Sequence, residues 1–254
     1  MAANRVSLMR IVLVGKTGVG KSAAGNVILR EKRFFKTAFR DSSVTKCCLN
    51  GVAEYSGRRI TVVDTPGLFD TELSNNEVTK EIVKCIEMSA PGPHAFFLVI
   101  RLGRFTEEEK ETVKIIQKVF GEEARKYMMV FFTHGDDLDE DQTIEDFVNN
   151  AGKDLKQLVE SCGNRYHVID GRNTKDQDQI EQLLKKVDAM VMESGGDFFS
   201  NELFKMMEKI IQDEKRLQEQ HKVEAELRRE IKKLREENSK LIQEKLRKPD
   251  CCIL

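Results

Sequence analysis

The chain has 254 residues, of which 40% are hydrophobic, and its formal net charge is −1. This length allows one large domain with an appendage, and the near-neutral charge argues against general nucleic-acid binding. The longest apolar run, residues 95–100, is too short to span a membrane. The six cysteines show no C-x-x-C or Cys/His spacing, and residues 1–5 lack the apolar core of a signal peptide, so a cytoplasmic chain without zinc sites is expected.

Short apolar runs alternate with helical patterns along the first 195 residues. This alternation predicts an α/β domain with a mostly parallel central sheet covered on both faces. Strands are expected at residues 11–14, 46–55, 59–63, 95–100, 127–132 and 166–169, and helices are expected to begin near Lys21, Asn75, Thr106, Ile144 and Asp178. The Gly195-Gly196 pair then interrupts the pattern, so we place the end of the domain at residue 195.

The first expected strand leads directly into a glycine-rich loop. Residues 15–22 read GKTGVGKS, which fits the phosphate-binding pattern G-x-x-x-x-G-K-[ST] between a strand and a helix. The glycines let successive N–H groups point at one anion, Lys21 adds a positive charge near the β- and γ-phosphates, and Ser22 can hold Mg²⁺. The residues expected to bind nucleotide here are Gly15, Lys16, Thr17, Gly18, Val19, Gly20, Lys21, Ser22 and Ala23. The loop predicts binding of a nucleoside di- or triphosphate.

Two further segments are expected to complete the phosphate and metal site. Residues 64–67 read DTPG after the third strand, so Asp64 can hold the water shell of Mg²⁺ and the Gly67 amide can meet a γ-phosphate. Ahead of the second strand, Thr45 is our first choice for a hydroxyl that closes over Mg²⁺ and the γ-phosphate. The alternates to Thr45 are Ser42 and Ser43. The expected metal ligands are therefore Ser22, Thr45 and Asp64.

Base recognition is expected after the fifth strand, where residues 133–138 read THGDDL. Guanine presents N1–H and N2–H₂ donors on one edge, and a single carboxylate can accept both, whereas adenine cannot satisfy this pairing. The T-x-x-D spacing selects Asp136, with His134 lying against the ring. Alignment on the trailing leucine selects Asp137 instead, and both aspartates remain candidates.

Hydrolysis requires an oriented water and stabilisation of charge in the transition state. Many GTPases supply a glutamine directly after the D-x-x-G glycine, but Leu68 stands there and cannot orient a water. Catalysis is therefore expected to be slow or assisted from elsewhere. Arg104, in the loop after the fourth strand, is the candidate helper, although by position alone it fits an ordinary surface arginine better.

Four segments together resemble the GIMAP family of immune-associated nucleotide-binding GTPases. They read GKTGVGKSAAGN from residue 15, SVTK from residue 43, DTPGLFD from residue 64 and LGRFTEEE from residue 102. The resemblance spans roughly residues 7–195. It implies a G domain like those of septins and chloroplast import receptors, which binds GTP or GDP with Mg²⁺ and pairs across its nucleotide face with a second copy or a related family member.

The resemblance also carries roles for individual residues. In some family members an arginine of the L-G-R box enters the partner's site and stimulates hydrolysis, which transfers to Arg104. The family commonly has a pair of asparagines near the guanine, where this chain has Asp170-Gly171. Asp170 is expected to contact the base through its backbone. Expression in immune cells and membrane-linked assembly are further implications of the resemblance.

The segment after residue 195 changes in composition. From residue 201 to 248 about half the residues are charged and none is glycine or proline. Apolar residues in steps of four and three indicate heptad spacing, with Asn238 on the seam. The heptad positions are Leu227, Ile231, Leu234, Asn238 and Leu241. Residues 196–248 are thus expected to form either an intermolecular coiled coil or one long helix that folds back on the domain.

Residues 249–254 read PDCCIL and form a candidate prenylation tail. In a C-a-a-X reading Cys251 is the lipid acceptor and the final leucine favours geranylgeranyl. Nearby basic residues would add attraction to the cytosolic leaflet of a membrane. An unmodified chain end is the alternative.

Two functions follow from these expectations. The first is a GTPase that is slow as a monomer and stimulated by self-pairing through Arg104. The second is a scaffold that oligomerises on a cytosolic membrane surface when GTP is bound and hydrolyses negligibly. A small-molecule kinase fits less well, because the DTPG segment and the T-x-x-D spacing indicate a GTPase arrangement.

Overall fold

The structure, a computed structural model, describes residues 7–31, 33–37, 47–67, 75–103, 105–139, 141–170 and 177–247. Six strands form one sheet in the order β2-β3-β1-β4-β5-β6, in which only the β2–β3 pair is antiparallel among the described ladders. The strands are β1 (Leu8–Val14), β2 (Leu49–Tyr55), β3 (Arg58–Asp64), β4 (Ala95–Arg101), β5 (Met128–Thr133) and β6 (Tyr166–Val168). The mostly parallel α/β architecture predicted from the sequence is confirmed.

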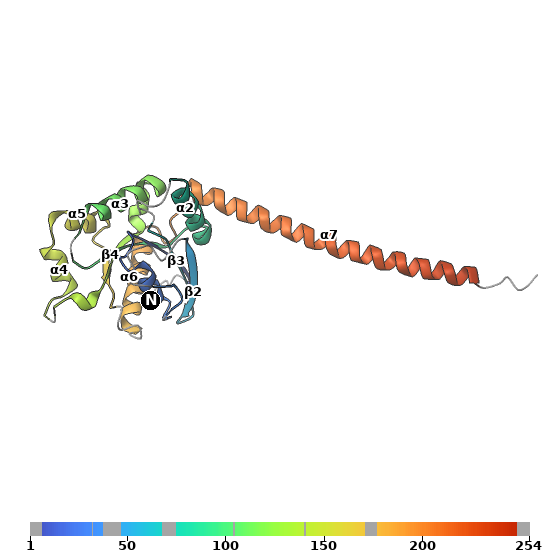
Figure 1. Cartoon of the computed structure of the whole chain (residues 1–254), viewed down its shortest axis with the longest axis horizontal. Helices are drawn as coiled ribbons and strands as arrows, with labels where there is room; N and C mark the ends of the chain where they lie inside the picture. Colours follow the sequence, from blue (N-terminus) through green and yellow to red (C-terminus); the bar gives the residue numbers. More distant parts are fainter. Residues whose placement is uncertain are drawn as a thin grey trace, which may run out of the picture. The chain divides into compact units, whose positions relative to one another are not determined.

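Helices cover both faces of this sheet (Figure 1). They are α1 (Lys21–Ile28), α2 (Asn75–Ser89), α3 (Glu107–Phe120), α4 (Ile144–Asn150), α5 (Lys153–Ser161), α6 (Gln177–Glu193) and α7 (Glu202–Arg247), with short 3-10 turns η1 (Glu122–Tyr127) and η2 (Gly135–Asp137). The sequence patterns did not predict α5 or η1. Among the described residues, no helix is both long and apolar enough to cross a membrane.

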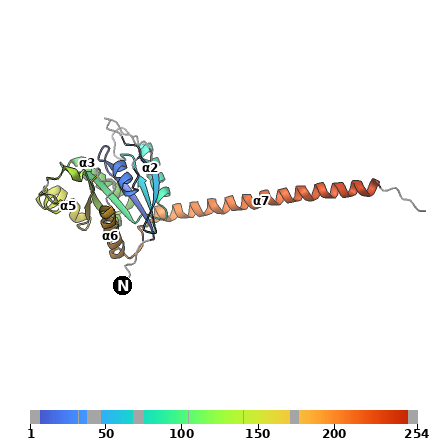
Figure 2. The same ribbon diagram turned by 90° about the horizontal axis from the view of Figure 1, so that it is seen from below.

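Alternation along the strands divides the core into two layers. In β1, Ile11 and Leu13 pack with α1 and α6, whereas Val12 and Val14 pack with α2 and α3 on the opposite face (Figure 2). All four side chains are essentially inaccessible to solvent. Because both faces are covered, the parallel strands read as continuous apolar runs, and this is why the sequence revealed them.

The chain divides into two compact units, one through Met207 and the other from Glu208. Phe199 and Phe204 belong to the first unit, where they pack against Phe120 and bury the start of α7 in the core. From residue 212 to 243 every described residue of α7 is exposed.

Candidate functional site

The expected site residues that the structure describes lie in the loops after β1, β3, β5 and β6, at the ends of those strands, or in the first turn of α1. Since β1, β3, β4, β5 and β6 are parallel, these loops emerge at the same edge of the sheet. Ligands of open α/β sheets bind at this carboxyl edge. The residues below are therefore arranged around one site.

The backbone of the loop after β1 requires its glycines. Gly18 and Gly20 have φ of 81° and 93°, in the left-handed region that side chains disfavour. Gly15 has φ of 152°, and a Cβ there would lie 2.6 Å from the Val99 carbonyl oxygen of β4. The loop thus lies directly on β4, with its curvature set by residues that carry no side chain.

Lys21 begins α1 and is held inside the loop. Its Nζ donates to the carbonyl oxygens of Gly15 at 3.0 Å and Lys16 at 2.8 Å, and the residue is only 6% exposed. A buried ammonium that bridges two loop carbonyls keeps its positive charge within the loop's concavity. This charge and the N-terminus of α1 both favour an anion there.

Ser22 and Asp64 bring together two side-chain oxygen atoms that can serve as metal ligands. The Ser22 hydroxyl donates to Asp64 Oδ2 at 2.6 Å, and Asp64 is fully buried at the end of β3. Mg²⁺ prefers oxygen ligands and uses few protein groups alongside phosphate and water. A hydroxyl and a carboxylate in contact beside a phosphate-binding loop fit that ion, with Mg²⁺ supplying charge neutralisation on the phosphates when bound.

The segment after β3 lies against the phosphate-binding loop. A Cβ on Gly67 would lie 2.0 Å from Thr17 Oγ1 and 2.9 Å from the Thr17 backbone nitrogen. Thr65, also buried, donates its hydroxyl to the Leu13 carbonyl at 2.7 Å. Only glycine therefore fits at position 67, where the backbone lies against Thr17 of the phosphate-binding loop. Contact of the Gly67 amide with a γ-phosphate stays a prediction.

The loop after β5 is tied to its neighbours on two sides. The Thr133 hydroxyl donates to the Val19 carbonyl at 2.7 Å, which links β5 to the phosphate-binding loop. The Gly135 N–H donates to the Ile169 carbonyl at 3.0 Å, which links the same loop to the end of β6. His134 between them has φ of 60°, so it turns the chain at this point.

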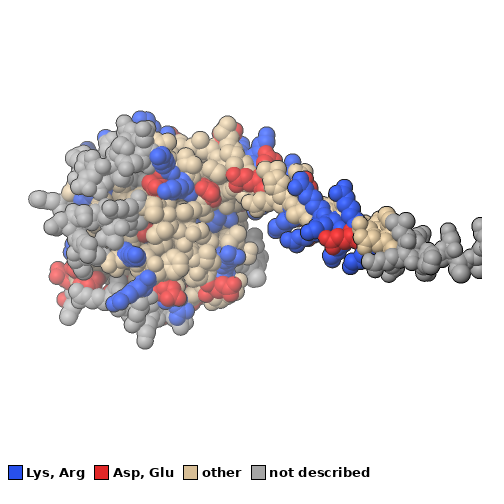
Figure 3. All heavy atoms as spheres, turned by 45° about the vertical axis from the view of Figure 1, so that its right-hand side comes forward, with Lys and Arg blue, Asp and Glu red and all other residues tan. Residues whose placement is uncertain are grey.

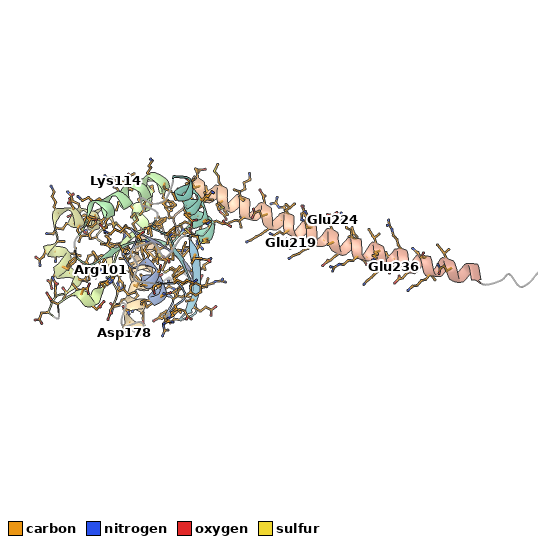
Figure 4. All side chains as sticks on the ribbon, in the orientation of Figure 1. Arg101, Lys114, Asp178, Glu219, Glu224 and Glu236 are labelled. Atoms are coloured by element: carbon orange, nitrogen blue, oxygen red, sulfur yellow. The ribbon has the colours of Figure 1, made fainter. Side chains whose placement is uncertain are left out.

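The two candidate aspartates differ in their surroundings. Asp137 is exposed and its Oδ2 lies 3.4 Å from an Nη of Arg101. Arg101, at the end of β4, is labelled in Figure 4. Asp136 is half-buried in the turn η2 that Gly135 anchors. Asp170 follows Ile169 and donates its backbone N–H to Gln179 Oε1 at 3.3 Å. The structure therefore gathers Asp136, Asp137 and Asp170 at adjacent strand ends.

An ion pair joins the phosphate-binding loop to α3. Lys16 Nζ lies 3.0 Å from Glu109 Oε1, and the Glu109 side chain is only 5% exposed. The other oxygen of Glu109 accepts the Thr106 N–H at 3.0 Å and also the Thr106 hydroxyl. Burial raises the pKa of the Glu109 carboxyl, but the hydrogen bonds from Thr106 and Lys16 outweigh burial and hold this pKa below its ordinary value.

The sequence patterns identified Lys16 only as a nucleotide contact and Thr106 only as the expected start of a helix. The partner role of Glu109 was missed, although a threonine followed three residues later by glutamate is the capping-box signal. Thr45, Leu68, Arg104 and Cys251 lie outside the described residues, so their expected roles stay predictions.

Comparison with known proteins identifies the family. The family model described as AIG1 matches residues 9–238. The chain belongs to the AIG1 family. Human GTPase IMAP family member 8 is 41% identical over 78% of this chain and 30% of the relative. Immune-associated nucleotide-binding proteins 9 and 7 of Arabidopsis thaliana are 38% and 35% identical over 76% and 94% of the chain, and over 58% and 81% of their own lengths.

The AIG1 assignment confirms the GIMAP resemblance. The chain spans 30% and 58% of the lengths of the first two relatives, which is less than two thirds of each. Among solved structures, Toc33 from Arabidopsis thaliana in complex with GDP and Mg²⁺ matches with a TM-score of 0.57 and 20% identity over 74% of this chain and 86% of that one. Toc33 with Mg²⁺ and GMPPNP matches with a TM-score of 0.54 and 19% identity over 74% and 86%. The P-loop G-domain fold predicted for this AIG1 protein is confirmed.

Proposed function

We propose that the chain binds GTP or GDP with Mg²⁺ and hydrolyses GTP slowly until two copies pair across their nucleotide faces, when Arg104 of one copy acts in the site of the other. The observation that carries this proposal is the ion pair between Lys16 and Glu109. It fastens α3, which the Arg104 loop enters, to the phosphate-binding loop.

The phosphate and metal groups have distinct roles in this reaction. Loop amides and Lys21 hold the β- and γ-phosphates, while Ser22 and Asp64 hold Mg²⁺ or its water shell. Thr45 closes over the metal when triphosphate is bound. The AIG1 family membership and the GDP–Mg²⁺ and GMPPNP–Mg²⁺ contents of the Toc33 structures support these ligands.

Asp136 is the proposed reader of guanine. Its carboxylate accepts the N1–H and N2–H₂ donors, with His134 beside the ring and Asp170 close to the base. The T-x-x-D spacing selects Asp136, which is half-buried, whereas Asp137 is exposed and its Oδ2 lies 3.4 Å from an Nη of Arg101.

Acceleration of hydrolysis requires a group that orients the attacking water or stabilises charge at the γ-phosphate. Leu68 cannot orient water, whereas an arginine supplied in trans is worth about 10³ to 10⁵ in rate where GTPases use one. A solved structure that matches this chain with a TM-score of 0.55 comes from work stating that dimerisation is important for the GTPase activity of atToc33 and psToc159. A similar arrangement is proposed for this chain.

GTP turnover per molecule against protein concentration tests the proposal. The wild type should turn over faster as concentration rises, and Arg104→Ala should stay at the dilute rate. The control is Lys118→Ala, which removes an exposed charge from the last turn of α3 and should behave like the wild type. A wild-type rate that does not depend on concentration, or an Arg104→Ala rate that rises with it, would overturn the proposal.

The alternative is a GTP-dependent oligomerising scaffold on a cytosolic membrane surface, attached through a prenylated Cys251, with negligible hydrolysis. The C-terminal CCIL sequence favours it. Metabolic labelling with a prenyl precursor should mark the wild type and leave Cys251→Ser unlabelled. Equal labelling of the two would remove the lipid anchor from this account.

A further inference from the structure

One apolar stripe runs along α7 between residues 227 and 241. Leu227, Leu234 and Leu241 recur every seven residues, with Ile231 and Asn238 between them. The leucines are 54–56% exposed and Ile231 is 41% exposed. In heptad notation the leucines occupy position d, and Ile231 and Asn238 occupy position a.

We propose that this stripe binds the same stripe of a second copy, forming a parallel, in-register, two-stranded coiled coil over residues 227–241. A β-branched residue at a combined with leucine at d is the pattern that favours two parallel helices. In that register Asn238 faces its own counterpart, and the two side-chain amides can hydrogen bond to each other.

The flanking charges select this orientation. Glu230 and Glu237 occupy position g, and Arg228 and Arg235 occupy position e. In a parallel pair, g of one helix faces e of the other, which sets Glu230 opposite Arg235 of the second copy. An antiparallel pair would instead face glutamate with glutamate and arginine with arginine. Figure 3 shows that both basic and acidic side chains lie on the surface of α7.

The coiled coil is short because the stripe is interrupted upstream. Glu224 and Gln220 stand at the preceding a and d positions, and Glu224 projects from the middle of α7 in Figure 4. Two heptads bind weakly by themselves but gain from any second contact that holds two copies close. This interface uses residues separate from the nucleotide site, so it goes beyond the proposed function and does not require it.

The first test measures self-association of the full chain in GDP by sedimentation velocity. We expect a concentration-dependent dimer that Leu234→Ala with Leu241→Ala weakens by about tenfold or more. The matched control is Lys233→Ala with Lys240→Ala. These lysines directly precede the two leucines and occupy heptad position c, outside the a and d stripe, so the dimer should be unchanged. A chain that stays monomeric throughout its soluble range, or equal behaviour of the two variants, would overturn the proposal and favour a helix that folds back.

The second test determines the orientation by exchanging charges. Glu230→Arg and Arg235→Glu should each weaken the dimer, since each alone sets like charges opposite one another. The double variant restores the opposite-charge pair in a parallel dimer and should recover wild-type association. Single variants that strengthen association would indicate antiparallel helices and contradict the proposed pairing. Because GDP is used throughout, failure of GTP-dependent pairing does not affect either result.

Discussion

Lys16 and Glu109 form an ion pair of 3.0 Å between the phosphate-binding loop and the first turn of α3. Glu109 also caps α3 through Thr106, so one carboxylate holds a helix end and a phosphate-binding loop at once. Lys16 and Glu109 are 93 positions apart in the sequence (109 − 16), and neither sequence motif predicts contact with the other. A substitution of Glu109 should therefore change both the free energy of unfolding and the rate of GTP hydrolysis.

Removal of the Glu109 charge should lower both stability and activity. Glu109→Gln retains an oxygen for the cap and should reduce the free energy of unfolding by about 1 kcal/mol, whereas Glu109→Ala also loses the cap and should cost about 1 kcal/mol more. Urea unfolding measures both values. In GTPase assays kcat should fall more than KM rises, since the Arg104 loop is displaced while the phosphate contacts remain.

Glu122→Gln is the control for this pair. Its carboxylate is 70% exposed in an i,i+3 pair with Arg125, so the free energy of unfolding should change by less than about 0.5 kcal/mol. Equal effects of Glu109→Gln and Glu122→Gln would show that the buried pair does not hold α3 in place.

Asp136 should determine base selectivity. Asp136→Asn replaces an acceptor by a side chain that also donates, so GTP affinity should fall by about 1–3 kcal/mol in binding free energy while xanthosine triphosphate, which has a carbonyl at C2, binds better than it does to the wild type. Nucleotide titration measures both affinities. Asp137→Asn is the matched change and should leave the preference for GTP intact; a preference lost in Asp137→Asn and retained in Asp136→Asn would assign the base to Asp137.

Ser22 should set the Mg²⁺ requirement. Ser22→Ala removes the hydroxyl that contacts Asp64 at 2.6 Å, so the Mg²⁺ concentration for half-maximal GTP hydrolysis should rise by about tenfold. Ser161→Ala removes a hydroxyl of α5 that donates to the Leu158 carbonyl at 2.7 Å, and should not change this concentration. An unchanged requirement in Ser22→Ala would place the metal ligands elsewhere.

His94 should make the domain sensitive to acid. Burial, with help from Arg10, lowers its pKa from 6.5 to about 4, although Asp197 opposes the shift, and its Nδ1 accepts the Arg10 backbone N–H at 3.0 Å. As pH falls, the unfolded state therefore binds a proton at this histidine before the folded state does. The free energy of unfolding should decrease by up to about 2 kcal/mol between about pH 7 and about pH 5.

His94→Asn tests this pH dependence, because asparagine offers an acceptor but does not titrate in this range. Its free energy of unfolding should fall less steeply with acid than that of the wild type. Part of the slope should persist, since burial also lowers the pKa of His167 to about 4. His221→Asn on exposed α7 is the control, and a slope that His94→Asn leaves unchanged would contradict the assignment.

Asn238 should limit the α7 assembly to two chains. A polar residue at position a costs stability but fixes register and oligomeric state. Asn238→Ile should therefore give tighter self-association and admit species larger than a dimer, both measurable by sedimentation equilibrium. Ser239→Ile, one position away from the seam, should do neither.

The sequence alone determined the local chemistry of this protein. The pattern of residues 15–22 defined a phosphate-binding loop because its glycines and lysine are needed wherever such a loop occurs. The buried strands were readable because both sheet faces are covered, which leaves continuous apolar runs. The short α5 was missed, because only two residues, Ala151 and Gly152, separate it from α4, and the sequence pattern gave a single helix start near Ile144.

Only the tertiary structure decided which distant residues meet. Three contacts depend on which strands lie side by side at the carboxyl edge of the sheet. They are the close approach of Gly67 to Thr17, the contact between Arg101 and Asp137, and the ion pair between Lys16 and Glu109. Local patterns carry no information on such contacts, because the order of strands in a sheet is set by packing of the whole domain. The sequence identified the groups that are expected to bind phosphate, and the fold connects one of them, Lys16, to the helix α3.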